Sequence, residues 1–134
     1  MQIHQIPQLR NPVAILAFNG WNDAGEAATG VISHLMNCWG TQENLIAESS
    51  SEDYYDYQQI RPTVFVDNSR IRRLTWPSTK VFAVLTPQLD FDLVVVRGPE
   101  PSFRWPTFCN EILDLFDDLE VDLVLTLGAL LADA

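Results

Sequence analysis

Carboxylate, amide and guanidinium side chains gather at three points where an apolar run of the sequence gives way to a polar corner. The apolar runs are residues 13–18, 92–97 and 121–127. Neighbouring carboxylates can raise one another's pKa far enough for acid–base catalysis, or they can bind a cation or an amine. The side chains that could do this chemistry are Asn22, Asp23, Glu26, Arg97, Glu100, Arg104 and Asp133.

A structural role for the same residues is the simpler alternative. Asp23, or its neighbour Asn22, can cap a helix, and Glu26 favours a helix N-terminus. Glu100, held between two prolines, can pair with an arginine. No nucleophile, base and orienting group stand out together, so the sequence identifies no catalytic residue and argues against an enzyme. The seven residues are predicted to be either a ligand-binding or a structural cluster.

The strands and helices around these corners form an α/β pattern. Residues 13–18, 92–97 and 121–127 are apolar runs typical of strands that are covered on both faces. Residues 24–39 and 102–116 carry apolar side chains at helical spacing. Because strand, helix and strand of this length form a parallel crossover unit, we expect the corners to meet at the carboxyl edge of one sheet, where ligands bind in such folds.

The middle third of the chain predicts antiparallel strands. Residues 63–66 and 71–76 flank the turn-rich segment Asp67-Asn68-Ser69-Arg70, which favours a hairpin. Residues 45–48 and 80–86 are further candidates for strands. We therefore predict an α/β fold that has a mainly parallel sheet, helices on both faces and an antiparallel β-meander.

Tryptophan, histidine and cysteine side chains are interpreted as packing residues. Trp21 and Trp105 border the carboxyl-end corners, where packing in the crevice is favoured over lining a ligand site. His34 lies beside apolar residues of the first predicted helix. Cys38 and Cys109 have apolar neighbours and no Cys-x-x-Cys partner, so buried thiols are favoured over a redox or zinc site. We predict no metal site and no cofactor.

Composition limits the class of protein. The 134 residues suffice for one domain, and 47% apolar with 19% charged residues is typical of a globular chain. The net charge of −10 disfavours nucleic acid and anionic membranes as partners. The N-terminus lacks the layout of a signal peptide, and the longest apolar stretch, residues 123–132, is too short to span a bilayer. We expect a cytoplasmic protein.

Four motifs follow one another along nearly the whole chain. They are "FNGWNDAGEAATG" at residues 18–30, "YYDYQQIRPTV" at 54–64, "RGPEPSFRWPTFCNEIL" at 97–113 and "LGALLAD" at 127–133. In this order they resemble the PAC2 family, which is named for a proteasome assembly chaperone, and in particular its bacterial, actinobacterial-type branch.

The resemblance implies an α/β fold similar to that of nucleoside-phosphorylase-like proteins and a tendency to form homo-oligomers. For eukaryotic and archaeal relatives it also implies ATP-independent help in assembling proteasome subunits. It therefore implies a protein-interaction module with protein partners. The alternative is a small-molecule-binding protein or enzyme that uses the carboxylate and arginine cluster.

The resemblance also bears on the extent of the domain. Family members run on beyond the last motif, so we expect residues 1–134 to be a single PAC2-like domain and an N-terminal fragment of a longer one. A sheet without its later strands should expose an edge and an apolar face at that end.

Overall fold

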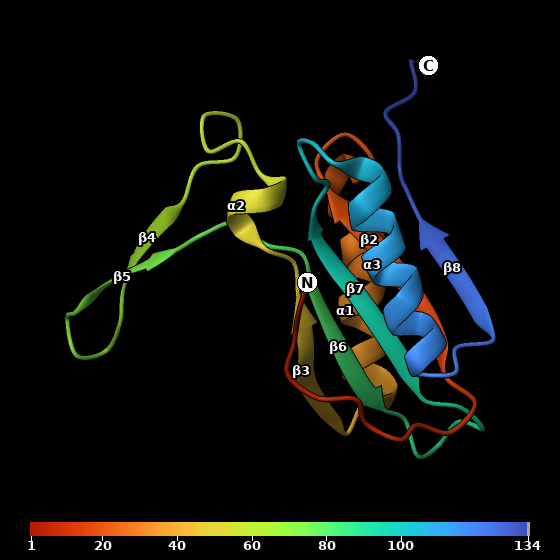
Figure 1. The fold of residues 1–134 in the computed structure, drawn as a ribbon. Coiled ribbons are helices and arrows are strands. Elements are labelled where there is room, and N and C mark those ends of the chain that lie inside the picture. Colours follow the sequence, from red (N-terminus) through yellow and green to blue (C-terminus); the bar gives the residue numbers. More distant parts are fainter. Residues whose placement is uncertain (134) are drawn as a thin grey trace.

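The computed structural model describes residues 1–133, which form a six-stranded sheet, two long helices and a separate hairpin (Figure 1). The order of strands across the large sheet is β1-β3-β6-β7-β2-β8. The strands are β1 (Gln2–Ile3), β2 (Val13–Asn19), β3 (Gln42–Glu48), β6 (Lys80–Leu85), β7 (Leu93–Pro99) and β8 (Leu123–Leu127). The α-helices are α1 (Ala27–Trp39), α2 (Ser51–Tyr54) and α3 (Trp105–Asp118). The predicted single domain extends to Ala134, which lies outside the described residues.

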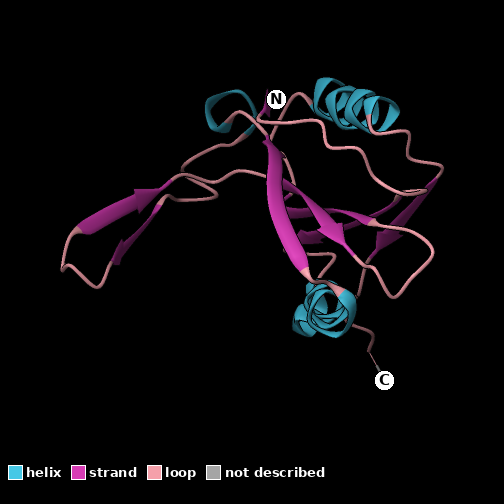
Figure 2. Ribbon diagram, turned by 90° about the horizontal axis from the view of Figure 1, so that it is seen from below, coloured by secondary structure: helices cyan, strands magenta, loops and turns pink. Residues whose placement is uncertain are grey.

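The two long helices cover opposite faces of the large sheet, as predicted and as Figure 2 shows. Successive residues of β2 point to opposite faces, so each face receives its own apolar core. Leu16 packs in the core that contains Phe108 of α3, whereas Ile15 packs in the core that contains Ile32 of α1. The two helices thereby hold β2 and its carboxyl-end corner between two packed layers.

The strand directions correct the prediction of a mainly parallel sheet. β2 pairs in parallel with β7 and with β8, as expected for strands joined through helices. The β6–β7, β3–β6 and β1–β3 pairs are antiparallel. The connection from β6 to β7, residues 86–92, contains no helix and simply reverses the chain. The α/β class is confirmed, and its sheet is mixed.

The predicted hairpin is confirmed, but it is a separate two-stranded sheet and not part of a continuous meander. β4 (Thr63–Val66) pairs antiparallel with β5 (Arg72–Thr75). Figure 1 shows this pair projecting away from the large sheet, beyond α2. We call residues 61–76 the arm and the remaining described residues the body.

Asp67 holds the turn of the arm. Its Oδ1 accepts hydrogen bonds from the backbone N–H groups of Ser69 (2.9 Å) and Ile71 (3.1 Å). Its Oδ2 accepts a hydrogen bond from Arg73 Nε at 2.8 Å. The bond from Arg73, followed by the bond from the Ile71 backbone, lowers the pKa of Asp67 below its usual value. An ionised Asp67 therefore stabilises the turn that the sequence predicted.

β8 differs from the buried strand that its apolar run predicted. Leu123, Val124 and Leu125 are exposed, on both faces of the strand. The reason is that β8 is an edge strand whose one neighbour is β2, and none of these three side chains belongs to either of the two cores that α1 and α3 cover. The expectation of an exposed edge and an apolar face at this end of the sheet is confirmed.

Candidate functional site

The three carboxyl-end corners meet at one edge of the sheet, as the pattern of parallel strands predicted. β2 lies between β7 and β8, so its corner is adjacent to both of the others. The Ala24 N–H donates to the carbonyl oxygen of Ala129 (3.0 Å), and the Ala129 N–H donates to that of Asn22 (2.7 Å). Asn22 Nδ2 donates to Glu100 Oε1 at 2.6 Å. Asn22 and Glu100 are thus candidate residues that the structure brings into contact.

Asp23 caps the first long helix. Its Oδ1 accepts bonds from the N–H groups of Ala28 (2.8 Å) and Thr29 (3.0 Å), and its Oδ2 accepts from Thr29 Oγ1 (2.6 Å). The Thr29 bonds outweigh burial and lower the pKa of Asp23. Gly25 and Glu26 have left-handed backbones (φ 63° and 56°), and this kink separates Asp23 from the start of α1. Asp23 is an ionised cap, and Glu26 is exposed to solvent.

Arg97 and Arg104 are paired with carboxylates outside the predicted cluster. Arg97 Nη2 lies 3.1 Å from Glu43 Oε1, and its guanidinium carbon lies 4.6 Å from the centroid of the Phe82 ring. Arg104 Nη1 lies 3.3 Å from Asp53 Oδ1. Within residues 1–133 neither arginine pairs with Glu100, so the alternative in which Glu100 pairs with one of them is wrong. Strand pairing places β6 beside β7 and β3 beyond β6, within reach of the Arg97 side chain. The left-handed backbone of Arg104 (φ 59°) begins α3 next to α2.

The remaining candidate, Asp133, is exposed at the end of the described residues. No hydrogen bond or ion pair joins its side chain to another residue within 1–133. A shared ligand-binding role for the seven residues stays a prediction.

Side chains that sequence reasoning missed hold the second corner in place. The Pro99 carbonyl oxygen accepts hydrogen bonds from Thr79 Oγ1 (2.8 Å) and Tyr55 Oη (3.2 Å). Burial raises the pKa of Tyr55, so its hydroxyl remains a donor. Gly98 has φ 147°, and a Cβ there would lie 2.7 Å from the Thr79 Cα. A glycine is required at this close approach. The spacing of these residues along the chain contains no signal for the contact.

A cavity of about 480 Å³ lies between the first and second corners. We call it the Glu100 cavity, since Glu100 and Trp21 line it together with Asn19, Ile60 and Pro99. Trp21 is 92% exposed, so the prediction that it packs within the crevice is wrong. The alternative, that Trp21 lines a ligand site, stays a prediction.

A second cavity of about 600 Å³ lies on the other side of Asn19, Ile60 and Pro99. We call it the basic cavity because its lining includes Arg61, Lys80 and Arg97. Both cavities have volumes typical of small-molecule sites, and both lie at the carboxyl ends of β2 and β7. Arg97 and Glu100 therefore line different cavities, although they are three residues apart in the chain.

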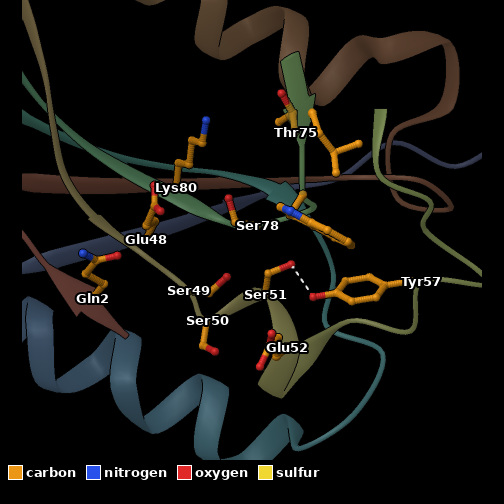
Figure 3. Close-up of a pocket in the computed structure, with 12 residues that line it drawn as sticks. Gln2, Glu48, Ser49, Ser50, Ser51, Glu52, Tyr57, Thr75, Ser78 and Lys80 are labelled. Atoms are coloured by element: carbon orange, nitrogen blue, oxygen red, sulfur yellow. Dashed lines mark hydrogen bonds between the residues drawn. The ribbon is translucent and has the colours of Figure 1, made fainter. Parts of the chain in front are cut away.

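A third cavity, of about 630 Å³, lies between the end of β3, α2 and the arm (Figure 3). Ser51 Oγ accepts a hydrogen bond from the Tyr57 hydroxyl (3.1 Å), which Figure 3 marks with a dashed line. Ser49 and Ser50 accept hydrogen bonds from backbone N–H groups. No histidine lines this cavity, and no serine in it is hydrogen-bonded to a carboxylate or a lysine within residues 1–133. The three serines have structural roles and lack the activation that a nucleophile needs.

The histidine and cysteine predictions are corrected by the packing of the helices. Cys38, Cys109 and His34 are all exposed. The buried stripe of α1 consists of Ala28, Ile32 and Met36, which recur every fourth residue and leave His34 and Cys38 outside it. Cys38 Sγ lies 3.5 Å from His34 Nε2. Within residues 1–133, no group of three or more His, Cys, Asp or Glu side chains is arranged to hold a metal ion.

Comparison with known proteins gives the family. The sequence profile of the PAC2 family matches residues 17–134. The chain belongs to the PAC2 family. In the part of this PAC2 protein that the structure describes, no helix combines the length and apolarity needed to cross a membrane.

Solved structures of similar proteins have the same fold. A PAC2 family protein from Streptomyces avermitilis is 47% identical in sequence to this chain, and the two structures superpose with a TM-score of 0.80. The match covers 90% of this chain and 51% of the Streptomyces chain. A Mycobacterium tuberculosis protein described as a proteasome-assembly chaperone homologue shares 45% identity and a TM-score of 0.81 over 90% of this chain and 50% of its own. A Corynebacterium glutamicum protein of unknown function shares 26% identity and a TM-score of 0.76 over 94% and 47% of the two chains.

The chain spans about half the length of these solved structures. No match was found among curated proteins.

Proposed function

We propose that this PAC2 protein is an ATP-independent, assembly-chaperone-like module that contacts its protein partners through the arm. The observation that carries the proposal is the apolar character of the arm in an exposed position. All eight residues of β4 and β5 are exposed. A two-stranded hairpin is only marginally stable alone in water, and exposed apolar patches are typical of protein-interaction sites.

The apolar side chains of the arm are concentrated on one face. Val64 and Val66 are two residues apart in β4, so they point to the same side, and each is 61% exposed. Leu74 of β5 lies directly opposite Val64 and therefore shares that face. This face, consisting of Val64, Val66 and Leu74, is the contact surface that we propose. The exposed residues of β8 form a second apolar surface. Substitutions in β4 and in β8 distinguish contacts made by the arm from contacts made by β8.

Charge supports self-association through the arm. Residues 61–76 contain four arginines and one acidic residue, a net charge of +3. The other residues contain four basic and seventeen acidic side chains, a net charge of −13. A basic arm and an acidic body attract one another between two copies, which supports the proposal of a homo-oligomer.

The family supports the class of partner. One relative is described as a proteasome-assembly chaperone homologue, and we extend that role to this chain as a proposal, with unassembled proteasome subunits as the partners. The sequence lacks a Gly-x-x-x-x-Gly-Lys-Ser/Thr loop for nucleotide phosphates, which is consistent with action without ATP. Proteasome subunits would place the protein in the cytoplasm.

The test is the capture of unassembled proteasome subunits from the same organism by the full chain, without ATP. We expect the wild-type chain to retain a subunit, and the Val64→Ser/Val66→Ser variant to lose it. The control is Val31→Ser, which changes an apolar residue of α1 that is also exposed. Failure of the wild-type chain to retain any subunit would contradict the chaperone-like role, and equal retention by the arm variant would contradict the role of the arm.

A further inference from the structure

The basic cavity concentrates positive charge in an acidic protein. Three of the eight basic residues, Arg61, Lys80 and Arg97, line this one cavity, whereas the whole chain has a net charge of −10. No carboxylate lines the cavity within residues 1–133. A cleft lined by charges of one sign raises the local concentration of ligands of the opposite sign. The cavity therefore favours an anion.

Strand pairing forces two of these cations together. Lys80 of β6 lies directly opposite Arg97 of β7. Like charges in directly opposite positions of an antiparallel pair are destabilising, because their side chains lie on the same face of the sheet. An anion bound between the two side chains would relieve this repulsion.

The positive charge is only partly neutralised by the protein. Arg97 makes one ion pair, with Glu43, and both side chains are substantially exposed, so most of its five donors remain available. Lys80 lies opposite Glu48 on its other side, but forms no ion pair with it. Lys80 also lines the third cavity, together with Glu48 and Glu52, and Figure 3 shows its side chain extending away from Ser49, Ser50 and Ser51. Arg61 likewise forms no ion pair within residues 1–133.

The rest of the lining suits an aromatic group beside the anion. Trp76 packs against Tyr57, with ring centroids 4.8 Å apart, and still exposes 47% of its surface. Thr75, Ser78 and Asn19 add hydroxyl and amide groups that can donate hydrogen bonds. Cations, hydroxyl groups and an indole ring thus line one open cavity at the carboxyl ends of β2 and β7.

We propose that the basic cavity binds a phosphate monoester that carries an aromatic ring, with the phosphate between Lys80 and Arg97 and the ring against Trp76. A phosphate dianion matches the surplus of positive charge better than a monoanion, and guanidinium groups bind phosphate oxygens through paired donors. The site includes residues of the arm, Trp76 among them, but none of Val64, Val66 and Leu74, which form the contact surface that we propose.

Phenyl phosphate is the probe that tests the proposal, in calorimetric titrations of the full chain. Inorganic phosphate lacks the ring, phenol lacks the charge, and benzylamine has the opposite charge. We expect saturable binding of phenyl phosphate that weakens with added salt, weaker binding of inorganic phosphate, and none of phenol or benzylamine. The proposal is overturned if phenyl phosphate does not bind saturably, or if phenol or benzylamine binds as tightly.

Variants locate the binding site. Lys80→Gln and Arg61→Gln should each weaken phenyl phosphate binding by about tenfold or more, since each removes a charged hydrogen-bond donor. Arg61 is exposed in the segment before β4, so its replacement leaves the strands of the body intact. Arg72→Gln is the matched control, because it removes the same charge from the arm outside the cavity, and we expect no change in affinity. Unchanged binding in both test variants, or an equal loss in the control, would refute the assignment.

Discussion

The strands of the body and those of the arm have similar compositions and opposite environments. Val94, Val95 and Val96 of β7 are at most 1% exposed, whereas Val64 and Val66 of β4 are 61% exposed. β7 has a strand on each side and a helix layer on each face, but β4 has one neighbouring strand and no helix over it. β-branched residues thus favour a strand in both places, while the number of neighbours decides whether the strand is buried.

Because of this difference, we expect the body to determine the stability of the fold and the arm to determine binding to other proteins. Buried apolar residues stabilise the fold in proportion to the area removed from water, so substitutions in the body should lower the free energy of unfolding. Substitutions in the arm should leave that free energy nearly unchanged and should alter contacts with other proteins.

The largest effect is expected from one phenylalanine in the core. Phe108 is 2% exposed, and its ring packs edge-on against Tyr54 with centroids 5.3 Å apart. Phe108→Ala should lower the free energy of unfolding by about 3–5 kcal/mol, because it leaves a cavity. The same change in the arm, Phe65→Ala, should cost less than about 1 kcal/mol. Urea denaturation measures the free energy of unfolding of both variants. Equal decreases in the two variants would contradict the distinction between body and arm.

An ion pair between the buried Asp92 and the half-exposed Arg10 should make the stability of the body depend on pH. Asp92 Oδ1 accepts hydrogen bonds from Arg10 Nη2 (2.9 Å) and from the Thr86 N–H (3.1 Å). Burial alone would raise the pKa of Asp92, but the bonds to Arg10 and Thr86 outweigh it and lower the pKa from the usual 3.8. At neutral pH, Asp92→Asn should cost about 1–3 kcal/mol, because it weakens these bonds in a buried place.

The sign of the pH effect follows from the lowered pKa. The stabilisation from Asp92 is complete above its usual pKa and is lost as the pH falls through the lower pKa of the folded state. The difference in unfolding free energy between wild type and Asp92→Asn should therefore shrink on acidification. Denaturation curves at neutral pH and below pH 3.8 measure it. A difference that stays constant over this range would show that the charge of Asp92 does not stabilise the body.

A smaller effect is expected from the helix cap. Asp23→Ala removes the acceptor of the Ala28 and Thr29 N–H groups and should lower the melting temperature by about 4 °C. The change should leave phenyl phosphate binding intact, since Asp23 does not line the basic cavity. Thermal unfolding followed by circular dichroism tests the cap. A variant that melts like the wild type but loses the ligand would assign Asp23 to binding instead.

The smallest change in stability is expected in the arm. Val64→Ser/Val66→Ser should lower the free energy of unfolding by less than about 1 kcal/mol, because both side chains are already exposed. Hydrogen exchange should show faster exchange of amides in the arm only. Global destabilisation comparable to that of Phe108→Ala would mean that the arm is packed as part of the body.

Local patterns in the sequence predicted the elements well. The run at 13–18 became β2, and the periodic segment at 102–116 became α3, because apolar spacing is a property of neighbouring residues. The run at 121–127 also became a strand, but burial of β8 depends on what lies beside it. The sequence pattern contains no information on that neighbour. The exposure of Trp21 was mispredicted for the same reason, because its burial also depends on which residues lie beside it.

The candidate site was only partly predictable for a related reason. The cap by Asp23 follows from spacing within a few residues. The ion pairs of Arg97 and Arg104 join residues 54 and 51 positions apart, and they depend on which strands and helices become neighbours. The basic cavity likewise combines side chains from the segment before β4 and from β6 and β7, which no spacing rule connects.

The molar mass of the protein in solution tests whether the arm is the contact surface. Light scattering after size-exclusion chromatography should give at least twice the mass of one chain for the wild type and the mass of one chain for Val64→Ser/Val66→Ser. Val124→Ser, which alters the exposed edge strand β8, should keep the wild-type mass. A wild-type chain that is monomeric, or an arm variant that keeps the oligomeric mass while Val124→Ser loses it, would contradict the claim.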